Sequence, residues 1–217
     1  SGTLRVTADP LFGELFLPEL LAAFAARHPA IRVDAVLTSR LVELAEERFD
    51  VAFRIGSLAD SSLVATRVAD ARLAFCAAPS YLRRRGRPRH PEELVEHDTI
   101  ALAPEGRPAE WAFAIGSAVR WVPLQPRMRV KHLGLAKRAA LRGLGVANLP
   151  LFACAEDLAH GALRLVLTEY NVPFGGIYVV HLSKRLVLPR VRRFVEFAVH
   201  KLRANLELQR QAGQTAQ

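Results

Sequence analysis

Hydrophobic positions in the first quarter of the chain alternate between the two-residue period of strands and the 3.6-residue period of helices. Leu17, Leu20, Leu21 and Phe24 fall on one helical face, and Pro29 follows the end of that stripe. The elements predicted in order are a strand over 4–8, a helix over 11–27, a strand over 31–37, a helix over 41–48 and a strand over 49–55. This alternation predicts a doubly wound α/β fold with a parallel sheet.

The rest of the chain predicts a second α/β lobe that is inserted into the first. Two extended segments follow residue 63, and short helices and strands then alternate as far as residue 182. A long amphipathic helix over 189–208 closes the pattern. We therefore expect two subdomains, with residues 1–73 and 178–217 in a discontinuous subdomain I and residues 74–177 in subdomain II.

Polar side chains follow the carboxyl ends of all three strands predicted in the first lobe. In an open α/β sheet the ligand crevice lies outside these ends, where the N–H groups of helix N-termini attract anions. Short hydroxyls beside an arginine suit a carboxylate. Capping is the alternative role of each residue taken singly, and their convergence on one edge favours a binding site. The segments concerned are Thr7-Ala8-Asp9, Thr38-Ser39-Arg40 and Arg54-Ile55-Gly56-Ser57.

The chain is strongly basic, with a formal charge of +9 at pH 7. Such a surplus attracts phosphates and carboxylates, but only four of the 30 basic residues are lysines, a skew that coding bias also produces. The run Arg83-Arg84-Arg85 before Gly86 suits either a DNA contact or a helix end, and we favour the helix end because arginines there complement the helix dipole. Charge alone does not identify a partner.

Motifs for catalysis and for cofactors do not occur in the sequence. It contains no G-x-S-x-G elbow, and none of its seven histidines lies four residues from another. The glycines of 143–148 follow a helix and precede a strand, which is the reverse of a dinucleotide-binding loop. Asp60 beside Ser61 and Ser62 is typical of a turn. We therefore expect no catalytic residue, no metal and no cofactor, and a protein that is not an enzyme.

Composition excludes a disordered or fibrous chain and a protein with membrane-spanning helices. Hydrophobic residues make up 51% and charged residues 24%, which is ordinary for a folded globular chain. No apolar run reaches the roughly 18 residues of a membrane span, so no membrane partner is expected. Cys76 and Cys154 stand in apolar surroundings, and we expect buried, inert thiols.

The chain contains, in this order, the segments "SGTLRVTADPLFGELFLPELLAAFAARHPAIRVDAVLTSR", "FDVAFRIGSLADSSLVATRV", "CAAPSYLRRRGRPRHPEEL", "AALRGLGVANLP" and "LPRVRRFVEF". Each segment alone is modestly specific, whereas the ordered set is highly specific. Together they resemble the C-terminal effector-binding domain of LysR-type transcriptional regulators, over nearly the whole chain.

This resemblance implies a periplasmic-binding-protein-like fold of type 2, with two α/β subdomains joined by crossover strands and a small effector bound between them. It implies that a winged helix-turn-helix DNA-binding domain and a linker helix precede Ser1 and are absent from this chain. Members of the family are bacterial and cytoplasmic, and they form homodimers or tetramers through subdomain I. DNA contact is then expected only through the missing N-terminal domain.

The resemblance also assigns an effector-binding set. Relatives often carry a small polar pair where this chain has Lys131-His132, a departure from the family pattern that bears on the class of ligand and would add positive charge to the cleft. The effector expected is a small carboxylate or another small anion. His132 would titrate near neutrality if solvated, and a surface position without a ligand role is the alternative. The residues assigned are Thr7, Ala8, Asp9, Thr38, Ser39, Arg40, Ile55, Gly56 and Ser57 in the first lobe and Leu102, His132 and Phe174 in the second.

Two functions fit this interpretation. One is an effector-sensing regulatory domain that transmits binding as a change in dimer or tetramer geometry. The alternative is a periplasmic-type solute-binding protein for a small anion. A secretion signal upstream would favour the second function, and a winged helix-turn-helix upstream would favour the first.

Overall fold

The computed structural model of the chain divides into two compact units. Unit 1 contains residues 1–71 and 175–208, and unit 2 contains residues 72–174 and 209–217. These divisions fall two and three residues before the boundaries that the sequence predicts after residues 73 and 177. The structure describes residues 2–40, 42–58, 63–103, 106, 108–182 and 188–215, with side chains as far as residue 207.

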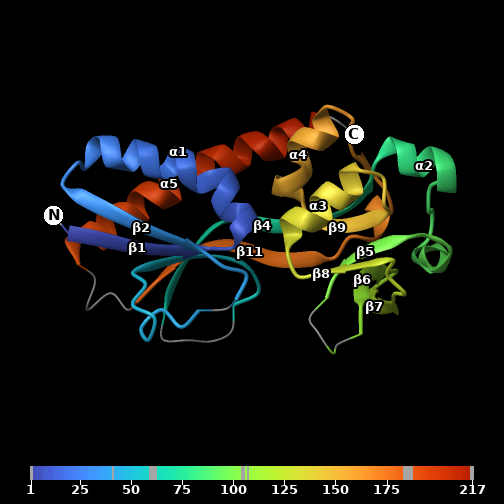
Figure 1. Cartoon of the computed structure of the whole chain (residues 1–217), viewed down its shortest axis with the longest axis horizontal. Coiled ribbons are helices and arrows are strands. Elements are labelled where there is room, and N and C mark those ends of the chain that lie inside the picture. The colour runs from blue at the N-terminus through green and yellow to red at the C-terminus, as the bar shows by residue number, and fades with distance from the viewer. Residues whose placement is uncertain are drawn as a thin grey trace. The chain divides into compact units, whose positions relative to one another are not determined.

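The sheet of unit 1 is built around its first strand. β1 (Gly2–Ala8) pairs in parallel with β2 (Ile31–Leu37) on one side and with β3 (Val51–Gly56) on the other. β11 (Pro173–His181) then pairs antiparallel with β3. The order β2-β1-β3-β11 therefore brings the carboxyl ends of three parallel strands to one edge, as predicted (Figure 1).

Two helices pack on this sheet through aromatic side chains. α1 (Pro10–Arg27) contributes Phe24, which makes a T-shaped contact with Phe194 of α5 (Pro189–Thr215). The two ring centroids are 5.0 Å apart. The same Phe194 ring lies 6.3 Å from that of Phe53 in β3. Phe24 and Phe194 are fully buried, so this contact ties the C-terminal helix to the N-terminal part of unit 1.

The helix predicted over 41–48 does not form. The segment after Val42 is a series of turns, with Arg48 at a φ of 58°, and Leu41 lies outside the described residues. Val42, Leu44 and Phe49 are all buried in one cluster with Ala52 and Val180 of the sheet. The spacing of these three apolar residues does not match one face of a helix, so an irregular path buries them better.

The sheet of unit 2 begins with the long strand β4 (Val64–Ala77), which starts in unit 1. The two extended segments predicted here are thus one continuous strand. β9 (Val146–Pro150) pairs antiparallel with β4, and β5 (Thr99–Leu102) pairs in parallel with both β9 and β8 (Met128–Val130). β10 (Arg164–Leu165) pairs antiparallel with the end of β4.

Both faces of this second sheet are covered. One cluster includes Ile100, Leu149 and Cys154, and α3 (Leu133–Leu141) and α4 (Leu151–Ala159) contribute to it. The other cluster includes Phe75, Tyr81 and Phe113. Its elements are α2 (Pro79–Arg85), the 3₁₀ turns η1 (Pro91–Glu96) and η2 (Thr168–Tyr170), and the hairpin of β6 (Glu110–Ile115) and β7 (Ala118–Pro123) (Figure 1). In the described part of the chain, no helix has the length and apolar composition that a bilayer crossing requires.

Candidate functional site

The first predicted segment joins β1 to α1. Thr7 and Ala8 are each 3% exposed, whereas Asp9 is half-buried and forms the N-cap of α1. Its Oδ1 accepts the backbone N–H of Leu11 at 2.9 Å and that of Phe12 at 3.4 Å. This helix N-terminus already has a carboxylate, so it offers less to an anionic ligand than an uncapped one would.

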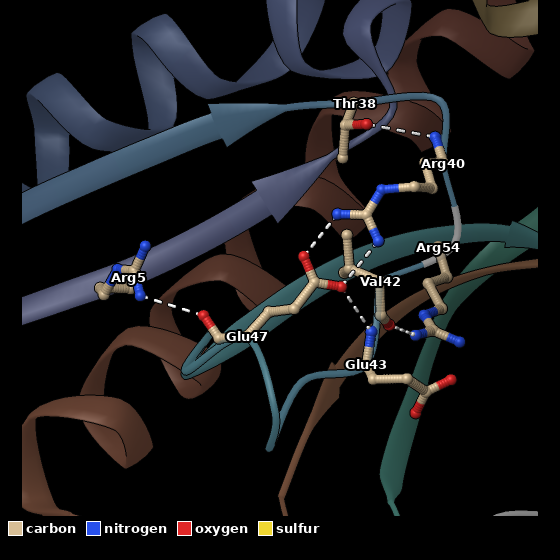
Figure 2. Close-up of polar contacts among 7 residues, drawn as sticks. All are labelled: Arg5, Thr38, Arg40, Val42, Glu43, Glu47 and Arg54. Carbon is tan, nitrogen blue, oxygen red and sulfur yellow. Dashed lines mark hydrogen bonds and ion pairs between the residues drawn. The ribbon is translucent and has the colours of Figure 1, made fainter.

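The second segment continues directly from β2. The Thr38 N–H donates to the carbonyl of Ala8 at 2.9 Å, and the Thr38 hydroxyl accepts the Arg40 N–H at 3.2 Å. Ser39, between them, is exposed. These bonds fix the turn against the end of β1, and Figure 2 shows the bond between the Thr38 hydroxyl and the Arg40 N–H.

Arg40 has an internal partner that the sequence did not reveal. Its guanidinium donates to both carboxylate oxygens of Glu47, with Nη1 to Oε1 at 2.9 Å. The Glu47 carboxylate also accepts the backbone N–H of Glu43 at 3.1 Å (Figure 2). The hydrogen bond and charge of Arg40 lower the pKa of Glu47, and Glu47 raises the pKa of Arg40. An effector carboxylate would therefore compete with Glu47 for this arginine.

The third segment lies at the end of β3. Ile55 is half-buried, Gly56 is buried with a φ of 105°, and Ser57 is exposed. The backbones at Gly56 and Gly175 lie so close together that a Cβ on Gly175 would be 2.4 Å from the Gly56 carbonyl oxygen. This approach requires a glycine at position 175. Arg54 turns back from the strand and donates to the Val42 carbonyl at 2.7 Å (Figure 2). Ser57 is thus the exposed hydroxyl of this segment.

The structure brings these three segments together at one edge of the unit 1 sheet. Ala8 is in register with Leu37 on one side and with Phe53 on the other, so the loops that follow the strands are neighbours. Ser39, Arg40 and Ser57 carry the exposed side chains of the set. The role of these residues in binding stays a prediction.

Two of the three residues predicted in unit 2 lie at the corresponding edge of its own sheet. Leu102 ends β5 and is 48% exposed, and the Ala103 N–H that follows it donates to the Val130 carbonyl of β8 at 3.2 Å. His132, the N-cap of α3, makes no side-chain capping hydrogen bond. Phe174, 38% exposed, comes from the beginning of β11, a different element.

Asn148 is a further candidate that the sequence pattern did not assign to the binding site. It lies near the carboxyl end of β9, opposite Phe75 of β4. Its Oδ1 is buried and has no hydrogen-bond partner among the described residues. A buried amide oxygen in this state costs free energy unless something donates to it. The signal available in the sequence was one polar residue inside the apolar run of 146–150.

The described residues contain no group of three or more histidine, cysteine or acidic side chains placed to hold a metal ion. Cys76 and Cys154 are both fully buried. The hydrogen bond with Cys154 and burial raise the pKa of Cys76 well above its ordinary value, so the reactive thiolate is disfavoured. Asp60, Ser61 and Ser62 lie outside the described residues.

Comparison with known proteins gives consistent matches. Residues 1–203 match the family model described as LysR substrate binding domain. An HTH-type transcriptional regulator of Xanthomonas campestris is 34% identical over 93% of this chain, which spans 60% of that protein's length. The regulatory domain of CrgA from Neisseria meningitidis, a LysR-type transcriptional regulator, has 29% identity and a TM-score of 0.83, with 93% of this chain and 99% of that chain covered. Full-length AphB of Vibrio cholerae has 25% identity and a TM-score of 0.81, and the match covers 93% of this chain and 68% of the AphB chain.

Proposed function

Because this chain belongs to the family of LysR substrate binding domains, we propose that it is the effector-sensing region of a bacterial LysR-type transcriptional regulator. Family membership confirms the resemblance and the periplasmic-binding-protein-like α/β fold that we expected from the sequence. The DNA-binding winged helix-turn-helix and linker helix belong to the remaining length of such a regulator, and a regulator of this kind acts in the cytoplasm.

We propose that the effector is a small carboxylate or a similar anion. Exposed hydroxyls and one guanidinium stand at the carboxyl edge of unit 1, and His132 opens α3 at the carboxyl edge of unit 2 without a side-chain cap. Uncapped N–H groups and a cationic or neutral imidazole both suit a negative group. The uncapped start of α3 is the observation that carries this choice, since α1 is already capped by Asp9.

The proposed output is a change in the geometry of a homodimer or tetramer assembled through unit 1. An effector shifts such an equilibrium only by its differential affinity for the two arrangements. Leu15 of α1 and Val36 and Leu37 of β2 are exposed apolar side chains of unit 1 and support a subunit contact through these elements.

A thermal-shift screen with small aliphatic and aromatic carboxylates tests the effector class. We expect at least one carboxylate to raise the melting temperature, and Ser39→Ala or Ser57→Ala to reduce that shift. Ser117→Ala in the exposed hairpin turn is the matched control and should keep the full shift. A shift that survives both site variants removes the unit 1 edge from the site, and the absence of any shift rejects a carboxylate effector.

A further inference from the structure

Arginines are concentrated at the end of α2 and in the turn that follows it. Five occur within seven residues, and all five are exposed. The helix dipole accounts for basic residues in the last turn of α2, but the helix ends at Arg85, with Gly86 as its C-cap, and two of the five arginines lie beyond it. We call this set the α2 arginine cluster, and its members are Arg83, Arg84, Arg85, Arg87 and Arg89.

Three side chains of the cluster are held by backbone carbonyls of other segments of unit 2. A guanidinium has five N–H donors, so one such bond orients the group and leaves further donors at the surface. The Arg84 guanidinium also lies over the ring of Tyr81, 5.6 Å from its centroid. The bonds are Arg84 to Gly143 at 2.8 Å, Arg85 to Glu96 at 2.7 Å and Arg87 to Leu165.

The helix α2, which carries the cluster, is held against the rest of unit 2 by buried contacts. Tyr81 is fully buried, and its hydroxyl accepts the Asp98 N–H at 2.8 Å and contacts His97 Nδ1 at 3.1 Å. Gly143 packs so closely that a Cβ there would lie 2.7 Å from the Ser80 hydroxyl. A helix held in this way, with oriented guanidinium groups, loses little conformational entropy when it binds a partner.

The side chains of the cluster lack carboxylate partners within the described part of the chain. Among the described residues, none of its five side chains forms an ion pair with a carboxylate. Glu93 of η1 accepts the backbone N–H of Arg89 at 2.9 Å, so its contact with Arg89 is to the main chain. Arg142 and Arg164, exposed neighbours of Gly143 and Leu165, extend the basic surface.

We propose that the α2 arginine cluster contacts the phosphate backbone of duplex DNA without regard to sequence. Oriented guanidinium groups match phosphate oxygens, and an array of them releases counterions on binding. Contacts to phosphate oxygens would position DNA rather than select a sequence, because they carry no sequence information directly. The choice of DNA rests on the proposed function, because a region of a DNA-binding regulator works beside a duplex.

Fluorescence anisotropy of this chain with a labelled duplex of arbitrary sequence, measured over a series of salt concentrations, tests the contact. We expect weak binding at low salt, with a Kd of roughly 1 to 100 μM and a steep salt dependence. Arg83→Gln/Arg89→Gln removes two charges whose side chains make no hydrogen bond among the described residues. This variant should lower the log–log salt slope by about two and weaken binding roughly tenfold or more.

Arg192→Gln/Arg193→Gln on α5 is the matched control, because it removes the same charge from exposed arginines of unit 1. It should change Kd less than about twofold. Equal losses in the two variants, or no salt-dependent binding by the unmodified chain, would overturn the proposal. Tighter binding to polyglutamate than to the duplex would also overturn it, in favour of an acidic protein partner.

The single variants Arg83→Gln and Arg89→Gln, each expected to lower the slope by about one, serve if the double variant does not fold. The assay contains no effector and therefore does not depend on the thermal-shift screen. Absence of DNA binding by the unmodified chain together with a carboxylate shift rejects the DNA contact alone, and salt-dependent DNA binding without a carboxylate shift rejects the effector class alone.

Discussion

The Arg40 guanidinium and the Glu47 carboxylate form a two-pronged ion pair that closes the irregular segment before β3, with Nη1 to Oε1 at 2.9 Å (Figure 2). The same carboxylate accepts the backbone N–H of Glu43. Arg40, which the resemblance assigned to the effector site, is thus already paired with the carboxylate of Glu47. An anionic effector that binds the two donors now held by Glu47 would exchange one carboxylate for another.

Glu47→Gln should make Arg40 more available to an effector. The neutral amide cannot form the charged two-pronged pair, so the competition for the guanidinium weakens. We expect affinity for the best carboxylate of the thermal-shift screen to rise by about two- to fivefold, the factor that an exposed ion pair is worth. Isothermal titration calorimetry measures the change. Glu46→Gln, one residue away and exposed, is the control and should leave affinity unchanged; a fall in affinity for Glu47→Gln would contradict the competition.

Stability should depend on pH through His97. Burial, followed by the charge of Arg85, lowers the pKa of His97, and Nδ1 of this ring contacts the Tyr81 hydroxyl. The folded state therefore disfavours the protonated ring. Its contribution to stability is complete above the ordinary pKa of about 6.5 and is lost as pH falls through the lowered pKa.

We expect the unfolding free energy of the unmodified protein to decrease below about pH 6.5 more steeply than that of His97→Gln. Urea denaturation at several pH values gives both curves. His160→Gln, an exposed histidine after α4, should keep the steeper dependence. Identical pH profiles for the unmodified protein and His97→Gln would show that this ring does not govern the effect.

The close approach of α2 to Gly143 predicts a stability difference between two glycine variants. Gly143 has a φ of 72° and meets Ser80, whereas Gly116 has a φ of 61° and nothing within 4 Å of an added Cβ. Gly116→Ala should cost about 1 kcal/mol through backbone strain alone. Gly143→Ala should cost about 1 to 3 kcal/mol more, through overpacking, in chemical denaturation.

Ser80→Ala in the Gly143→Ala background removes the hydroxyl that the new methyl group meets. We expect it to restore part of the lost stability, as a double-mutant cycle would record. Equal costs for the two glycine variants would mean that the contact with Ser80 contributes nothing.

Asn148 should show opposite effects on stability and on binding. Asn148→Leu removes a buried amide oxygen without a partner among the described residues and should stabilise the fold by about 1 kcal/mol. If the amide donates or accepts toward the effector, the same change should abolish the carboxylate shift. Asn171→Leu, at an exposed position, should alter stability by less than about 0.5 kcal/mol. Destabilisation by Asn148→Leu would show that the amide is satisfied in the folded protein.

Local signals predicted much of unit 1. The helix after β1 was expected from residue 11 and begins at Pro10, because its apolar stripe and its Asp9 cap are both local features. The segment 41–48 was predicted wrongly because the contacts that shape it are tertiary. Burial of Val42 and Leu44 on the sheet and the pairing of Arg40 with Glu47 depend on contacts between side chains rather than on a period in the sequence.

The candidate site was predictable to the level of strand ends. Parallel strands carry their carboxyl ends to one edge, so the order of strands and helices along the chain was enough to group Thr38 with Ser57. The internal partner of Arg40 and the buried Oδ1 of Asn148 could not be predicted in this way. Both follow from the packing of side chains, which periodicity does not encode.

The contact of Phe194 with Phe24 and Phe53 has a consequence for synthesis on the ribosome. Unit 1 lacks α5 until the last part of the chain has emerged, whereas residues 72–174 of unit 2 have emerged earlier. The second unit is therefore free to fold first. Until α5 emerges, the strands β1, β2 and β3 lack the helix that covers Phe53. Release of a chain that stops before α5 would expose this face of the sheet to chaperones and proteases.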